Sequence, residues 1–178
     1  AGGRNVYVGG FFLHAGGKQT YYFARWVEPL SVDSPNGGEI WDAGSSHAVT
    51  WIADASVGPV KIEYSTNNGS TWTTVTASTP NTGTYSWTVP NTPSASARVR
   101  ISEAADGDPV DASDAAFAIA GFKMTVPGSG DTWTLGSQRT IAWSTVGSWG
   151  SVRIELSRNN GSTWETIVEN TTNTGSYA

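Results

Sequence analysis

Apolar and polar residues alternate with a period of two along most of this chain, which is the pattern of β-strands with one buried face. Residues 48–51, 60–65 and 98–101 show the alternation most clearly, and turn sequences such as Asn68-Gly69 and Asp106-Gly107 close the runs. No window carries a sustained helical stripe. Roughly seven short strands in a stretch of about 90 residues predict an all-β fold, a two-sheet antiparallel sandwich.

The alternation also assigns side chains to faces. Val60, Ile62 and Tyr64 are expected to face the core, and Lys61 and Glu63 are expected to lie on a solvated face of the sheet. Glu63 is therefore not expected to belong to a catalytic carboxylate pair, which needs two carboxyl groups roughly 5–10 Å apart in one cleft. The sequence offers no other catalytic constellation, so we do not expect an enzyme.

An internal repeat organises the chain. Trp41 returns as Trp133, 92 positions later, and the hexapeptide at 67–72 recurs letter for letter at 159–164. Self-similarity in one register over this length indicates two copies of one domain. We expect three parts: a short β segment at residues 1–30 that resembles neither copy, a first sandwich at 31–120, and an incomplete second sandwich at 121–178.

The second copy ends where the first has only reached Ser86, so it lacks counterparts of the later strands. Five large apolar residues are missing from its core, and at about 1.5–3 kcal/mol each their absence forfeits roughly 10 kcal/mol. That is about the stability of a whole domain. Two explanations stay open: the sequence is a fragment of a longer protein, or strands from residues 1–30 of another subunit complete the sandwich and build a filament.

Several segments together resemble a known family. They are the run Ser-Pro-Asn-Gly-Gly-Glu-Ile-Trp at 34–41, Val-Thr-Trp at 49–51, and the segments 60–65, 68–72, 85–90 and 111–114. Across residues 31–178 the combination resembles the tandem immunoglobulin-like module of secreted microbial surface proteins, of the Ser/Thr-rich cell-wall-synthesis type. The resemblance implies a non-catalytic, extracellular or cell-surface β-sandwich and does not specify a ligand.

Residues 5–26 resemble one repeat of a bacterial β-propeller. They contain Tyr-Val-Gly-Gly at 7–10, Ala-Gly-Gly at 15–17 and Ala-Arg-Trp at 24–26. Propeller blades depend on neighbouring blades to cover their faces. A single blade of this kind is therefore expected to pack on something outside itself.

Composition and charge exclude several classes of function. The formal net charge is −5 without a basic cluster, which argues against a nucleic-acid partner. No apolar run approaches the roughly 18 residues of a membrane span. The chain contains no Cys and only two His, which excludes thiol catalysis and Cys-based metal sites.

One acidic cluster could hold a cation. Asp106, Asp108 and Asp111 place carboxylates near a glycine bend, and hard oxygen donors of this kind suit Ca²⁺. The spacing is not that of an EF-hand, and Asp111 and Asp114 also belong to the family signature, where they would hydrogen-bond a turn. The sequence thus predicts no obligatory cofactor and leaves calcium as an alternative.

The aromatic residues offer a second candidate site. Trp51 and Trp143 alternate with polar residues inside strands and are predicted to be core. Trp149 has no aromatic counterpart in the first copy and lies in a Gly/Ser loop, so it is the candidate for stacking on a glycan or, alternatively, for covering a sheet edge.

These observations favour a non-enzymatic extracellular structural or adhesive module, such as a stalk or filament subunit assembled by β-strand complementation. Its expected partner is protein, through self-association or neighbouring domains of a longer chain. The alternative is a carbohydrate-binding accessory domain of a larger secreted protein, with cell-surface glycans as ligands.

Overall fold

The computed structural model describes residues 6–9, 14–15, 18–19, 23–26 and 29–178, with side chains from residue 29 onward. Every regular element in these ranges is a β-strand. Among them there is no helix long and apolar enough to cross a membrane. The predicted all-β sandwich fold is confirmed.

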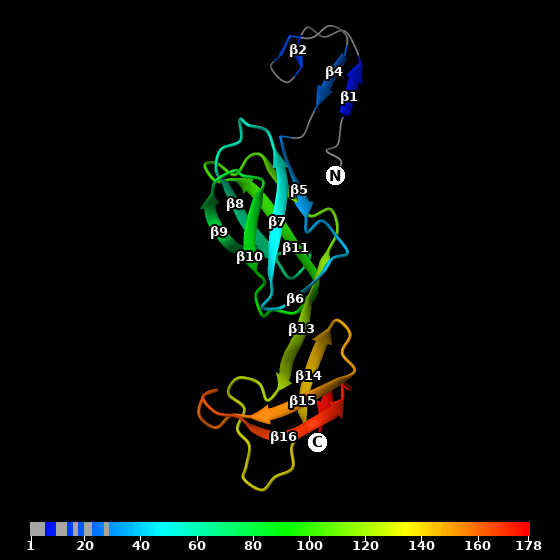
Figure 1. The fold of residues 1–178 in the computed structure, drawn as a ribbon, viewed down its shortest axis with the longest axis vertical. Coiled ribbons are helices and arrows are strands. Elements are labelled where there is room, and N and C mark those ends of the chain that lie inside the picture. Colours follow the sequence, from blue (N-terminus) through cyan, green and yellow to red (C-terminus); the bar gives the residue numbers. More distant parts are fainter. Residues whose placement is uncertain (1–5, 10–13, 16–17, 20–22, 27–28) are drawn as a thin grey trace.

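The first copy forms two packed sheets (Figure 1). One contains β5 (Leu30–Ser34), β7 (Ser46–Ala53) and β10 (Thr84–Thr88), all antiparallel in the order β10-β7-β5. The other contains β8 (Val60–Ser65), β9 (Thr73–Thr79), β11 (Ser94–Glu103), β12 (Val110–Ala112) and β13 (Phe117–Val126). The short strand β6 (Ile40–Asp42) pairs parallel with β13. The chain therefore crosses from the first sheet, which contains β5, to the second sheet between β5 and β6.

Inward-facing residues of both sheets build one core. They are mostly β-branched and aromatic, which suits a pleated surface buried on one side. The buried members are Leu30, Val32, Trp41, Val49, Trp51, Val57, Val60, Ile62, Trp87, Val89, Ala97, Val99, Ile101, Phe117 and Ile119. The predicted core positions of Val60, Ile62 and Trp51 are confirmed, whereas Tyr64 is only partly buried and packs against the cluster.

Glu63 was expected to lie on a solvated face of the sheet, but the residue is only 6% exposed. Lys61 Nζ lies 2.7 Å from one carboxylate oxygen, and Arg100 on the adjacent strand β11 lies 2.6 Å from the other. The Arg100 guanidinium in turn stacks on the Trp72 ring at 4.4 Å. Burial by itself raises the pKa of Glu63, but the hydrogen bonds from Lys61 and Arg100 and their charges outweigh it and leave the pKa below its usual value.

Strand β13 belongs to both copies. Its first residues pair with β11 and β6, and from Gly121 to Val126 it pairs with β14 (Ile141–Val146) of the second copy. Strand β17 (Ser176–Tyr177) pairs with β14 on its other side, so β13-β14-β17 repeats the order of β5-β7-β10. The strands β15 (Ser151–Leu156) and β16 (Glu165–Thr172) form a separate hairpin, equivalent to β8 and β9.

Two small antiparallel strand pairs precede the first sandwich. They are β1 (Val6–Gly9) with β4 (Phe23–Trp26), and β2 (His14–Ala15) with β3 (Lys18–Gln19). Neither pair joins another sheet of the described residues. Figure 1 shows the β1–β4 pair and the second copy at opposite ends of the long axis, with the first sandwich between them.

Candidate functional site

The acidic cluster is arranged as a turn. Asp106 Oδ1 accepts a hydrogen bond from the Asp108 backbone N–H at 3.0 Å, and Asp111 Oδ2 accepts one from the Val32 backbone N–H at 2.7 Å. Asp111 thereby links β12 to β5, a structural task. Within the described ranges, no three acidic, His or Cys side chains gather as a metal site would require. Calcium binding by Asp106, Asp108 and Asp111 stays a prediction, and unfolding with calcium or with EGTA tests it.

Trp149 is half-buried in the loop between β14 and β15. Its ring packs against Phe122 of β13, with centroids 4.8 Å apart. A Cβ added at Gly147 would lie 2.7 Å from the Trp149 ring. Glycine at this position therefore lets the indole lie directly against the backbone. Part of the ring is open to solvent, and glycan stacking by Trp149 also stays a prediction.

The repeated hexapeptide forms the same tight turn in both copies. In the first copy, Asn67 Oδ1 accepts a hydrogen bond from the Thr71 backbone N–H at 2.9 Å, and Asn68 adopts a left-handed φ of 57°. Asn159 Oδ1 accepts from the Thr163 backbone N–H at 2.8 Å in the second copy. Asn tolerates this region of φ better than most residues. The motif therefore forms the turn that connects β8 to β9 in the first copy and β15 to β16 in the second.

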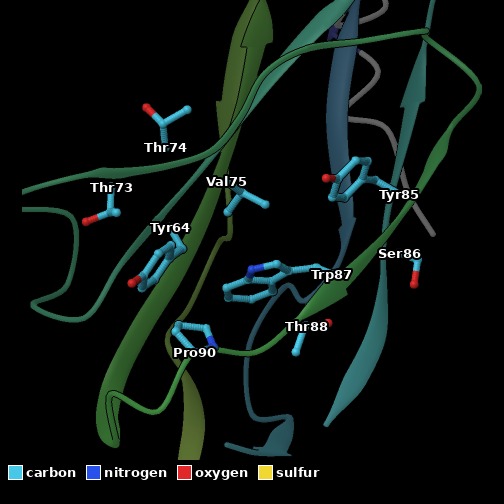
Figure 2. A pocket seen from close by; sticks show the side chains of 9 residues that line it. All are labelled: Tyr64, Thr73, Thr74, Val75, Tyr85, Ser86, Trp87, Thr88 and Pro90. Carbon is cyan, nitrogen blue, oxygen red and sulfur yellow. The ribbon is translucent and has the colours of Figure 1, made fainter. Parts of the chain in front are cut away.

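A shallow groove of about 460 Å³ lies on the first sandwich, between β8–β9 and β10. Figure 2 shows Tyr64, Trp87, Tyr85 and Pro90 around it, with threonine and serine hydroxyls among them. Tyr64 and Trp87 touch, with ring centroids 5.3 Å apart. Sequence reasoning missed this groove because its walls come from opposite sheets, whose juxtaposition the alternation pattern does not specify.

The inner face of the second copy is open where that of the first is closed. Trp133 is 39% exposed, whereas its counterpart Trp41 is 6% exposed; Met124 is 54% exposed, whereas Val32 is 2% exposed. The exposed large apolar residues of this copy are Phe122, Met124, Val126, Trp133, Leu135, Leu156, Trp164 and Ile167. Exposed apolar surface of this kind is common where a protein contacts another segment or partner.

The edge of β15 borders this open face. In the first copy β8 lies between β9 and β11, whereas β15 pairs with β16 alone among the described strands. Its backbone groups on the other side are available to an added strand.

Ile154 of β15 is nevertheless buried, and Trp143 of β14 donates its indole N–H to Asn173 Oδ1 at 2.7 Å, as Trp51 does to Asn81. The predicted core position of Trp143 is thus confirmed, and the half-sandwich is shaped like its complete counterpart.

No protein-family model matches the chain, and no curated protein is similar to it. Among solved structures, the fibronectin(III)-like modules of Clostridium thermocellum CbhA align with 83% of this chain and 76% of theirs, at 19% sequence identity and a TM-score of 0.32. A similarity this low carries no argument about function. The sandwich assignment rests on the chain's own strand pairing and core.

Proposed function

We propose that this chain is a non-enzymatic structural or adhesive module of an extracellular surface protein, a stalk or filament subunit whose second sandwich is completed by an added β-strand segment. The observation that carries the proposal is the open inner face of the second copy beside the edge of β15 that no strand in the described part of the chain pairs. The first copy shows what covers an equivalent face: β11 and the start of β13. An added segment with their chemistry would bury the same surface by strand addition.

A peptide tests this proposal directly. We would add a synthetic peptide of residues 94–119, which spans β11 and the start of β13, to the full chain and follow tryptophan emission. The peptide contains no Trp, so every change reports on the chain. Emission should shift to the blue and saturate at one peptide per chain, because Trp133 would lose solvent.

A matched peptide serves as the control. It carries Val99→Asp and Ile101→Asp, which face the core in the first copy, and it should bind at least about tenfold more weakly because two charges would be buried without partners. Hydrogen exchange adds a second readout, since the amides of β15 should become protected. If neither peptide binds, or both bind alike, strand completion is refuted.

Carbohydrate binding is the second candidate function, and the groove of Figure 2 favours it. Tyrosine faces beside hydroxyl groups are a common lining for sugar rings, which stack on aromatic side chains and hydrogen-bond at their edges. Trp87 lies in the groove and would report binding by fluorescence. A glycan that changes the emission of the intact chain but not of Tyr64→Ala or Tyr85→Ala would support this function, and an unchanged emission across a glycan panel would refute it.

A further inference from the structure

The groove on the first sandwich is lined, among the residues that the structure describes, by uncharged side chains alone. Four of them carry aliphatic hydroxyls, two carry phenol hydroxyls, and the others are Val75, Trp87 and Pro90. A charged ligand group would lose water here without gaining an oppositely charged partner. The volume of about 460 Å³ is within the range of small-molecule sites. This lining suits an uncharged ligand that carries hydroxyl groups.

Trp87 brings an unpaired donor to the groove. The residue is only 6% exposed, and no described residue accepts a hydrogen bond from its indole N–H, whereas Trp51 donates to Asn81. No buried side-chain nitrogen or oxygen of the described residues lacks a partner, so the Trp87 nitrogen must be accessible to solvent. Figure 2 shows its ring in the groove, between Tyr64 and Tyr85. Because an indole N–H only donates, the ligand atom opposite it should be an acceptor oxygen.

The tyrosines supply the stacking surface. Tyr64 and Tyr85 are half-buried, and neither phenol hydroxyl has a hydrogen-bond partner among the described residues. The planes of Tyr64 and Trp87 are inclined by 45°, so a flat ligand can stack on only one of them. The tyrosine is the more exposed of the two. A sugar ring would therefore stack on Tyr64 and direct the oxygens at its edge toward the indole N–H.

The second copy shows that the hairpin itself does not require this lining. Leu156 takes the place of Tyr64 there, and Glu165 takes the place of Thr73. The two residues pair across β15 and β16 as Tyr64 and Thr73 pair across β8 and β9. Leucine and glutamate at these positions would remove an aromatic face from the groove and add a charge. The chemistry of the groove is thus separable from the strand pairing that surrounds it.

We propose, building on the carbohydrate-binding candidate above, that this groove binds an uncharged oligosaccharide. One sugar ring stacks on Tyr64, and an oxygen at its edge accepts the hydrogen bond from the Trp87 N–H. The serine and threonine hydroxyls of the groove bond to further sugar hydroxyls. Uronic acids bind poorly, because their carboxylates would lose water without meeting a cation.

Matched pairs of oligosaccharides test the charge requirement. We would titrate the full chain by calorimetry with hexamers of β-1,4-linked glucose, mannose and galactose, and with each hexamer oxidised at C6 to its uronic acid. At least one neutral hexamer should bind at one site per chain, and its oxidised form should bind at least about tenfold more weakly. The chain has a formal net charge of −5, so long-range repulsion also acts on acidic sugars. The discrimination should persist in 1 M NaCl, where the Debye length is about 3 Å.

Variants taken from the second copy test the location. Tyr64→Leu with Thr73→Glu installs in the first hairpin the pair that β15 and β16 already carry. It should abolish binding and leave the urea midpoint near that of the unaltered chain. The reverse exchange, Leu156→Tyr with Glu165→Thr, is the matched control. It lies outside the groove and should leave the affinity unchanged.

The indole N–H of Trp87 is tested separately. Trp87→Phe keeps an aromatic ring and removes the donor, so the neutral hexamer should bind about three- to tenfold more weakly, as expected for the loss of one hydrogen bond. The indole resonance that is missing from this variant identifies Trp87 in the ¹⁵N NMR spectrum of the unaltered chain. That resonance should shift as the hexamer binds, a readout that does not depend on the stability of the variant.

The outcomes separate this inference from the candidate function on which it rests. Equal binding of neutral and oxidised hexamers in 1 M NaCl would overturn the uncharged ligand and leave carbohydrate binding in place. Binding that survives Tyr64→Leu with Thr73→Glu, or that leaves the Trp87 resonance unmoved, would overturn the groove as the site. If none of the hexamers binds, both the inference and the carbohydrate-binding candidate are refuted.

Discussion

Truncating one repeated tryptophan in each copy measures how closed the two cores are. Trp41 is packed on three rings, with centroids 4.4 Å from His47, 5.3 Å from Phe117 and 6.1 Å from Trp87. Removing a buried tryptophan costs about 3–5 kcal/mol, and the loss of three ring contacts places Trp41→Ala at the upper end of that range. Trp133 is more than a third exposed, so the same substitution removes less buried surface and should cost about two-thirds as much or less.

Urea unfolding followed by far-UV circular dichroism is the assay. Trp41→Ala should move the main cooperative transition of the first sandwich to a much lower urea concentration, and Trp133→Ala should leave it in place. Addition of the 94–119 peptide should then make the second substitution costly, because Trp133 would acquire a core. Equal costs for the two substitutions without peptide would refute our conclusion that the second core is open.

Three further predictions concern the first copy. Glu63→Gln should weaken the loss of stability at acidic pH, because the pKa of Glu63 is lower in the folded than in the unfolded chain. The carboxylate therefore stabilises the fold above the unfolded pKa, and this contribution is lost as pH falls through the folded pKa. Urea midpoints measured from pH 7 to pH 2 test this, and an unchanged pH dependence in the variant would argue against the pairing with Arg100. Ser113→Ala should cost about 1–3 kcal/mol in urea unfolding, because the buried Val99 N–H loses its acceptor at 3.0 Å, whereas a cost below 0.5 kcal/mol, about the effect of a surface substitution, would contradict that bond. Asn67→Ala should lower the midpoint of thermal unfolding by several degrees, for a loss of about 1 kcal/mol, and no shift would mean that the turn does not need the side chain.

Sequence patterns were sufficient for the parts of the fold that local alternation and the repeat determine. Val60 and Ile62 are buried as predicted, and β13, β14 and β17 of the second copy pair in the same order as β5, β7 and β10 of the first. The burial of Glu63 was not predictable in this way. Its cover comes from Arg100, 37 positions away, and only the pairing of β8 with β11 brings the two side chains together.

The junction between the copies shows a second limit. A glycine at position 121 reads in sequence as the start of a new unit. In the structure it lies within β13, where an added Cβ would come within 3.0 Å of Pro93 and 3.2 Å of Ala43. A side chain there would have to displace Pro93 or Ala43 slightly, so the glycine allows close packing within a strand, a role that a single sequence does not distinguish from a turn.

The shared strand β13 has a mechanical consequence. Tension applied along the long axis passes from one sandwich to the next through a single extended backbone that is hydrogen-bonded to both, with no slack segment to straighten first. An extended strand is already close to its maximal length per residue. The pair should therefore resist stretching along this axis, and its end-to-end length should stay nearly constant under load until hydrogen bonds within a sheet break.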